Sequence, residues 1–130
     1  MIIKSINPNK FVDFSTQISQ GLLVKGSKML VVSGQVALNK EGKVEGKGSI
    51  KRQMEVIMER LGYILEEAGG NFSHVIKVTM FLTDINKLPE AIEVRSKYLK
   101  ENKPAATAVE VSALVKPDLL IEVEIMAVLD

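Results

Sequence analysis

Cysteine is absent from this chain of 130 residues, and histidine occurs only once. Without cysteine there can be no disulfide, no thiolate nucleophile and no Cys-ligated zinc. A single histidine does not make a multi-histidine metal site, so we expect neither a metal nor a cofactor. His74 follows Ser73 where a predicted helix gives way to a strand. We interpret it as a structural or capping residue rather than as the base of a catalytic triad.

Net charge and long apolar runs are also lacking. The chain carries 17 lysines and arginines against 16 acidic residues, a formal net charge of +1, and aromatic residues are 5%. This balance offers no field or stacking surface for a polyanion, so nucleic acid is not an expected partner. No run of apolar residues approaches the roughly 20 needed to cross a bilayer, and no signal peptide is evident. We expect a cytoplasmic protein without a membrane partner.

What is present is the composition of one globular domain. Hydrophobic residues make up 46% and charged residues 25% of the chain, which argues against disorder. A chain of 130 residues can bury a sizeable core. We therefore treat residues 1–130 as a single domain.

Apolar residues spaced by three and four predict two helices. The first has Ser49 as its N-cap and ends at Gly69 and Gly70, because glycine adopts the left-handed conformation readily. Its apolar stripe consists of Ile50, Met54, Ile57, Leu61, Ile64 and Ala68. The second runs from about residue 88 to about residue 101, with Pro89 in the first turn, where proline is tolerated.

Alternating apolar residues predict six strands. They lie at residues 2–6, 21–24, 29–33, 75–82, 103–111 and 119–129. The short connection 25–28 predicts that the second and third strands form a hairpin, and the turn 115–118 predicts the same of the last two. Between the third strand and the first helix, residues 39–48 contain three glycines and form a solvated loop.

The order of helices and strands predicts an α+β domain with both helices on one face of a mixed sheet. In the last strand, alternate apolar residues from Leu119 to Ala127 should face the helices. The opposite face carries Glu122 and Glu124 among hydrophobic side chains. An apolar sheet face that the helices cannot cover is typical of an interface, so we predict a homo-oligomer, most simply a closed ring.

Two groups of residues are candidates for chemistry. Glu122 and Glu124 point the same way and can divide acid and base roles, or can both be solvent-facing; Glu110 on the neighbouring strand has the same two interpretations. The glycine-rich loop 42–49 lacks the Gly-Lys-Ser/Thr order of a phosphate-binding loop, because Gly48 separates Lys47 from Ser49. We interpret it as a surface loop.

Six segments of the sequence resemble the RidA/YjgF family of reactive-intermediate deaminases. They are Ile-Ser-Gln-Gly at 18–21, Val-Ser-Gly-Gln-Val at 32–36, Leu-Glu-Glu-Ala-Gly-Gly at 65–70, Val-Ile-Lys-Val-Thr-Met-Phe-Leu-Thr-Asp at 75–84, Pro-Ala-Ala-Thr-Ala-Val-Glu-Val at 104–111 and Ile-Glu-Val-Glu at 121–124. The resemblance implies a chorismate-mutase-like (YjgF-like) α+β fold with a mixed six-stranded sheet. It also implies a homotrimer in which three sheets form a central barrel with the helices outside.

The family resemblance also implies a site in the clefts between subunits. In deaminating members, the arginine of a Pro-Ala-Arg-[Ser/Thr] motif binds the carboxylate of a 2-imino acid, and a glutamate on the last strand positions water. Here Ala106 stands in place of that arginine, Ile18 in place of a tyrosine and Ile92 in place of a helix asparagine. Ser33 and Glu122 are retained. The implied ligand contacts are Ile18, Ser33, Gly34, Gln35, Ile92, Ala106, Thr107 and Ala108, with Glu122 as the catalytic residue.

The resemblance and these departures together predict a homotrimer without the arginine clamp that binds a small, less anionic ligand in its intersubunit clefts. Hydrolysis of an imine, enamine or related bond is its candidate reaction. One alternative is a 2-iminobutanoate/2-iminopropanoate deaminase that uses a substitute cation, for which Arg95 and Lys103 are the candidates. Another is a regulatory or chaperone-like binding module without catalysis. The ribonuclease or translation-inhibitor activity of some relatives is disfavoured by the charge balance.

Overall fold

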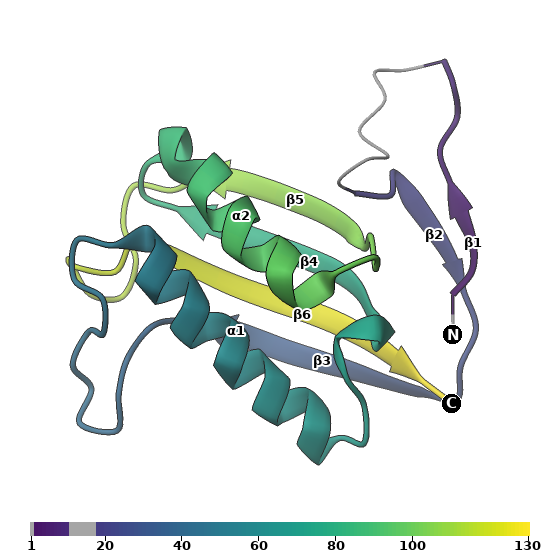
Figure 1. Ribbon diagram of the computed structural model, residues 1–130, viewed down its shortest axis with the longest axis horizontal. Helices are drawn as coiled ribbons and strands as arrows, with labels where there is room; N and C mark the ends of the chain where they lie inside the picture. Colours follow the sequence, from purple (N-terminus) through teal and green to yellow (C-terminus); the bar gives the residue numbers. More distant parts are fainter. Residues whose placement is uncertain (1, 11–17) are drawn as a thin grey trace.

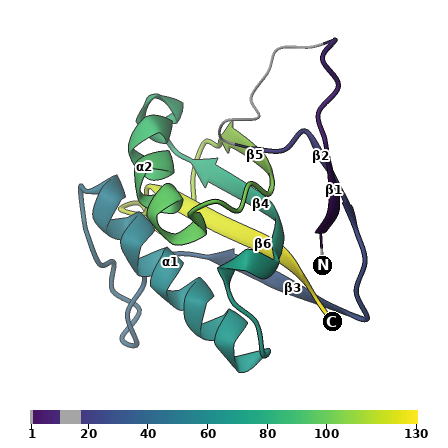
Figure 2. The ribbon, with the colours of Figure 1, turned by 45° about the vertical axis from the view of Figure 1, so that its right-hand side comes forward.

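The computed structural model describes residues 2–10 and 18–130. Both helices cover one face of a four-stranded sheet, and a two-stranded hairpin lies to one side (Figure 1, and turned by 45° in Figure 2). The elements are β1 (Ile2–Ile6), β2 (Gly21–Val24), β3 (Lys28–Gln35), α1 (Ile50–Glu67), β4 (Val75–Leu82), α2 (Leu88–Leu99), β5 (Ala105–Glu110) and β6 (Ile121–Leu129). Short 3-10 turns at Phe72–His74 and Ile85–Lys87 precede β4 and α2. The predicted α+β class is confirmed.

The larger sheet is mixed, as predicted, and its strands follow the order β3-β6-β4-β5. β6 is antiparallel to both of its neighbours, whereas β4 and β5 are parallel and joined through α2. Every residue of β6 is buried or half-buried, while half of β5 is exposed. A strand this apolar suits the centre of the sheet, which leaves β3 and β5 as the two edges.

Both hairpins predicted from short connections are wrong. β2 pairs with β1, and β3 pairs with β6. β4 lies between β5 and β6, so those two strands do not touch as a pair. The reason is burial. Beside β6, β3 places Val32 in the core, and the central place of β6 gives its apolar residues two neighbouring strands.

The six predicted strands all form, but they make a sheet of four and a sheet of two rather than one sheet of six. The only bridge between the region of β2 and the larger sheet in the described residues is the parallel bridge from Ser19 to Ala105. The connection from β2 to β3 therefore turns the chain out of the β1–β2 hairpin and into the main sheet. Local turn signals do not distinguish this course from a hairpin.

Helix α1 begins and ends where the sequence predicts. The Ser49 side chain accepts a hydrogen bond from the backbone N–H of Arg52 at 3.2 Å, which satisfies a free donor of the first turn. At the other end Gly69 has a φ of +87°, a conformation that a residue with a Cβ rarely adopts. The N–H of Gly70 then donates to the carbonyl of Leu65 at 2.8 Å and closes the helix.

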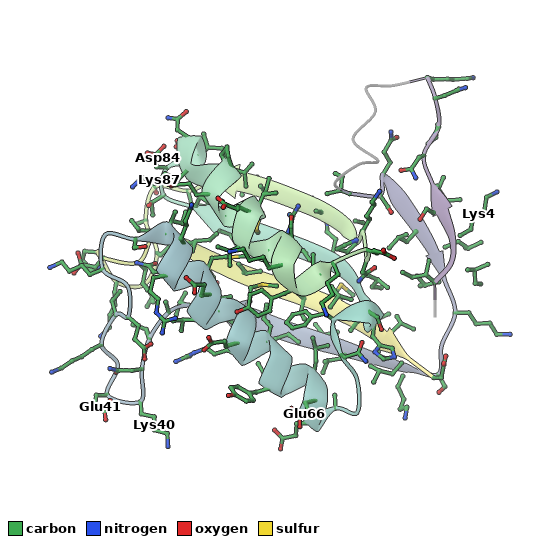
Figure 3. All side chains as sticks on the ribbon, viewed as in Figure 1. Lys4, Lys40, Glu41, Glu66, Asp84 and Lys87 are labelled. Atoms are coloured by element: carbon green, nitrogen blue, oxygen red, sulfur yellow. The ribbon has the colours of Figure 1, made fainter. Side chains whose placement is uncertain are left out.

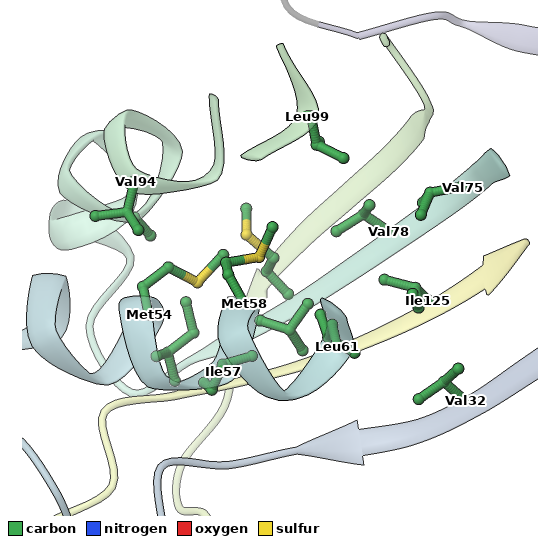
Figure 4. Packing of buried hydrophobic residues seen from close by; sticks show 14 of the residues in the cluster. Val32, Met54, Ile57, Met58, Leu61, Val75, Val78, Val94, Leu99 and Ile125 are labelled. Atoms are coloured by element: carbon green, nitrogen blue, oxygen red, sulfur yellow. The ribbon is translucent and has the colours of Figure 1, made fainter. Parts of the chain in front are cut away.

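The core lies between the helices and the inner face of the four-stranded sheet. Figure 4 shows Met54, Ile57 and Leu61 of α1 over Val78 of β4 and Ile125 of β6. The alternate residues predicted to face the helices are all buried; they are Leu119, Ile121, Val123, Ile125 and Ala127. The predicted inner face of the last strand is therefore confirmed.

One polar side chain, that of Gln53 in α1, is fully enclosed in this core. Its Nε2 donates to the carbonyls of Gly46 and Asp118, at 3.2 and 2.9 Å, and its Oε1 accepts from the backbone N–H of Leu120 at 2.8 Å. A single amide thus joins α1 to the glycine-rich loop and to the start of β6. Enclosed polar groups need such partners.

Most charged side chains lie at the periphery, with Arg95 of α2 as a buried exception. Figure 3 shows Lys40 and Glu41 at the tip of the loop 39–48 and Glu66 at the end of α1, all directed away from the core. Within residues 2–10 and 18–130, neither helix combines the length and the apolar character that crossing a membrane requires.

Candidate functional site

A pocket of about 380 Å³ lies between the edge strand β5 and helix α2. Its volume falls in the range of about 300–1,000 Å³ that is usual for small-molecule sites. It is lined by Ile18, Met80, Leu88, Ile92, Arg95, Ala106, Thr107 and Ala108. Five of these residues, Ile18, Ile92 and the three from β5, are ligand contacts that the sequence resemblance implied.

The alternation of β5 opens this pocket. Ala106 and Ala108 face the helices and pack against the core. Because alanine side chains are short, they leave space beneath α2 that larger residues would fill. Thr107 belongs to the opposite face, where its hydroxyl accepts a hydrogen bond from the Lys77 ammonium at 2.7 Å. The two alanines therefore make most of the β5 wall of the pocket apolar.

Residues 18–20 close one side of the pocket by docking on the start of β5. The backbone N–H of Ser19 donates to the carbonyl of Pro104 at 3.2 Å, and its hydroxyl donates to the carbonyl of Lys103 at 2.6 Å. Ser19 is buried by these contacts. They fix the position of the neighbouring Ile18, which contributes to the apolar lining.

Arg95 supplies the only charged side chain among the residues lining this pocket. It is only 4% exposed, yet its guanidinium makes no hydrogen bond or ion pair with any described residue. Burial lowers the pKa of Arg95, but arginine titrates so far above neutral pH that the group stays charged. Of the two substitute cations considered from the sequence, Arg95 lies in the pocket, whereas Lys103 is exposed and does not line it.

The other implied site residues, Ser33, Gly34, Gln35 and Glu122, lie together on β3 and β6. The carboxylate of Glu122 lies against Gly34, where an added Cβ would come within 1.9 Å of Glu122 Oε2. Gln35 Nε2 donates to the carbonyl of Ser33 at 3.1 Å, and the pairing of β3 with β6 is irregular at this point. A side chain at position 34 would have to displace the Glu122 side chain, because the carboxylate occupies that space.

The implied site residues form two groups, one at the β5 edge of the sheet and one on β3 and β6, toward the opposite edge. β5 is one edge and β3 is the other, with β4 and β6 between them. Glu122 is on the sheet face away from the helices, since its neighbours Ile121 and Val123 point into the core. No described residue of the β3–β6 group lines the pocket at β5.

Two candidates from the sequence have structural contacts. Glu110 Oε1 accepts a hydrogen bond from the backbone N–H of Ile85 at 2.9 Å, which anchors the turn before α2. His74 Nδ1 accepts from the backbone N–H of Asn71 at 3.0 Å in a capping box. The predicted capping role of His74 is confirmed.

We predict that Gly34→Ala lowers the free energy of unfolding by about 1–3 kcal/mol, because the new methyl group displaces the Glu122 side chain. In a Glu122→Ala background the same change should cost almost nothing. Urea denaturation of both single variants and the double variant measures this coupling.

Gly62→Ala on α1 is the matched control, since its added Cβ meets no atom closer than 3.4 Å. It should stabilise the helix by about 0.5–1 kcal/mol. Equal costs of Gly34→Ala with and without Glu122 would contradict the contact.

Comparisons with known proteins agree on one family. The family model described as Endoribonuclease L-PSP matches residues 10–129. A RutC family protein of Pyrococcus abyssi is 43% identical over 104 residues, covering 80% of this chain and 81% of that protein. The human 2-iminobutanoate/2-iminopropanoate deaminase is 33% identical over 110 residues, covering 85% and 78%. The crystal structure of YyfB, a Rid-family protein of unknown function from Yersinia pestis, aligns with a TM-score of 0.86 at 25% identity, covering 97% and 98%.

The fold and these matches define the class of protein as α+β with a YjgF-like mixed sheet and two helices. The chain belongs to the RidA/YjgF family. Some relatives, the human protein among them, are named as deaminases.

Proposed function

We propose that this chain is a small-molecule binding protein whose ligand sites form between the subunits of a homotrimer. The observation that carries the proposal is the separation of the implied site residues into two groups. Ile18, Ile92 and Ala106 surround the pocket at the β5 edge, while Ser33 and Glu122 lie toward the β3 edge. One subunit cannot bring them together, but a ring that sets the β5 edge of one copy beside the β3 edge of the next can.

The sheet face away from the helices supports this assembly. Met29 and Val31 of β3 are 59% and 68% exposed, and Val109 of β5 is 40% exposed. Glu122 and Glu124 are half-buried among them. Large aliphatic side chains gathered on one face of a subunit are typical of an interface. In the proposed trimer three such faces form the central barrel, and the pockets lie at its seams.

The candidate reaction is hydrolysis of an imine, or of an enamine that first becomes the imine by moving a proton from nitrogen to carbon. Water held by Glu122 adds its oxygen to the carbon of the C=N bond while a proton passes to nitrogen. The C–N bond of the resulting carbinolamine then breaks, a C=O bond forms, and ammonia leaves. Glu122 accepts and returns the proton in these steps. Ala106 provides no cation on β5, so the wall formed by β5 holds the ligand through apolar contacts.

The test is the decay of 2-iminobutanoate generated in situ. We expect the wild-type protein to accelerate the decay less than Ala106→Arg does, because no β5 arginine orients the carboxylate. Ala106→Arg should raise the rate about tenfold or more, since hydrogen bonds to charged groups contribute about 1.5–3 kcal/mol each. Adding Glu122→Ala to Ala106→Arg should remove the gain.

Other outcomes would contradict this assignment. Fast wild-type turnover that Glu122→Ala abolishes would establish a deaminase with a substitute cation. Inactivity of the wild type and of all the variants would favour the second candidate, a binding module without catalysis. That candidate is supported by the missing arginine at position 106.

A further inference from the structure

Arg95 is the one charged side chain that lines the apolar pocket between β5 and α2. We propose that Arg95 is the anion-binding residue of this pocket and that its ligand is a small anion with a short apolar chain, of which a short-chain carboxylate is the simplest. This inference rests on the ligand site proposed above. It assigns the anion contact to helix α2 instead of to β5.

The burial of Arg95 without a partner needs an explanation. Removing a charge from water costs free energy that an ion pair or hydrogen bonds normally offset. Other cations in the described part of the chain have such contacts: Lys51 lies 3.0 Å from Glu93, and Lys77 donates to Thr107. Arg95 is far more buried than either of them and has none. No described side chain offsets its burial, which leaves solvent or a group that enters from outside the described residues to do so.

Arg95 lines the pocket, and its charged end is not sealed off from solvent. Among the described residues, no side-chain nitrogen or oxygen is both enclosed from solvent and without a hydrogen-bond partner. The unpartnered nitrogens of Arg95 therefore keep some access to solvent, and the opening that Arg95 lines is this pocket. A group that enters the pocket can accept hydrogen bonds from the guanidinium.

The shape and chemistry of the pocket define the ligand class. A planar guanidinium donates two parallel hydrogen bonds to a carboxylate, an arrangement that favours a planar anion. Ile18, Leu88 and Ile92 offer apolar contacts to the rest of the ligand, and the two alanines of β5 leave room for it. A volume of about 380 Å³ limits that ligand to a small molecule.

The experiment is calorimetric titration of the full chain with butanoate and with butanamide, its neutral counterpart of equal shape. The wild-type protein should bind butanoate more tightly than butanamide. Arg95→Met keeps an unbranched side chain and removes the charge, so it should weaken butanoate binding about tenfold or more and leave butanamide binding unchanged. Arg95→Lys should restore part of the affinity, because it keeps the charge without the fork.

Arg60→Met on α1 is the control, since Arg60 is a helix arginine outside the pocket; it should not change either affinity. Equal loss of both ligands in Arg95→Met would overturn the inference in favour of a packing role. Unchanged butanoate binding in Arg95→Met would show that Arg95 makes no anion contact. If the wild type does not bind butanoate and Arg95→Met weakens the trimer, Arg95 instead forms an ion pair between copies, and the inference is overturned. If Arg95→Met does not fold, the affinities of Arg95→Lys for butanoate and butanamide test the inference instead.

The two proposals fail differently. Butanoate binding that depends on Arg95, with no imine hydrolysis by the wild-type protein or by Ala106→Arg, would support the anion site and refute the reaction. If the rate of hydrolysis is the same in the wild type and in Arg95→Met, and the wild type binds butanoate no more tightly than butanamide, the reaction is supported and the anion site is refuted.

Discussion

Gln53→Met is expected to lower the free energy of unfolding by about 3–5 kcal/mol. The substitution leaves the N–H of Leu120 and the carbonyls of Gly46 and Asp118 without their partner. Each buried group that loses its hydrogen bond costs about 1–3 kcal/mol, and solvent can reach some of them after local rearrangement. Methionine fills nearly the same volume, so the loss reports the hydrogen bonds more than a cavity. Urea denaturation at one fixed protein concentration measures the change.

Glu66→Gln on the same helix is the control, because Glu66 is exposed near the helix end and projects away from the core (Figure 3). It should change the stability by less than about 0.5 kcal/mol. A loss below about 1 kcal/mol in Gln53→Met would show that Gln53 does not join α1 to the loop and to β6 in the way the three distances indicate.

The helices and strand faces could be predicted from the sequence because local patterns determine them. Ser49, Gly69 and the apolar stripe of α1 act within one segment, and alternation along β6 fixes which side chains are buried. The strand pairing could not be predicted in the same way. It depends on which strand buries most apolar surface at the centre, and that is a property of the assembled sheet. The short connections after β2 and before β6 carried no information on this choice.

The site was predicted from resemblance more than from residue patterns. Ile18, Ile92 and Ala106 come together in one pocket although they are distant in the sequence. Met80 and Leu88 were missed as pocket residues because their apolar spacing is also that of core positions. The isolation of Arg95 could not be predicted, since a helix stripe does not show whether a carboxylate will reach it. Gln53 was missed as well, although its place between Ile50 and Ile57 puts it on the apolar stripe.

Val31→Glu is expected to raise the dissociation constant of the proposed trimer more than a hundredfold. Val31 lies on the sheet face away from the helices, paired with Met126 of β6, and is 68% exposed in the single subunit. In the trimer this face is buried, so each copy would place a carboxylate without a partner in an apolar interface. The cost is several kcal/mol per buried charge. Sedimentation velocity at micromolar concentration should show trimers for the wild type and single subunits for the variant.

Tyr63→Glu is the matched control, because Tyr63 is 72% exposed but lies on α1, outside the proposed interface. It introduces the same charge at nearly the same exposure, and the trimer should persist. Loss of the trimer in Val31→Glu should also abolish ligand binding at the pocket. Each site pairs Ala106 of one copy with Glu122 of the next, and dissociation separates these two copies. A folded wild-type chain that sediments as a single subunit would remove the basis for a site shared between copies, because β3 and β5 stand at opposite edges of the sheet.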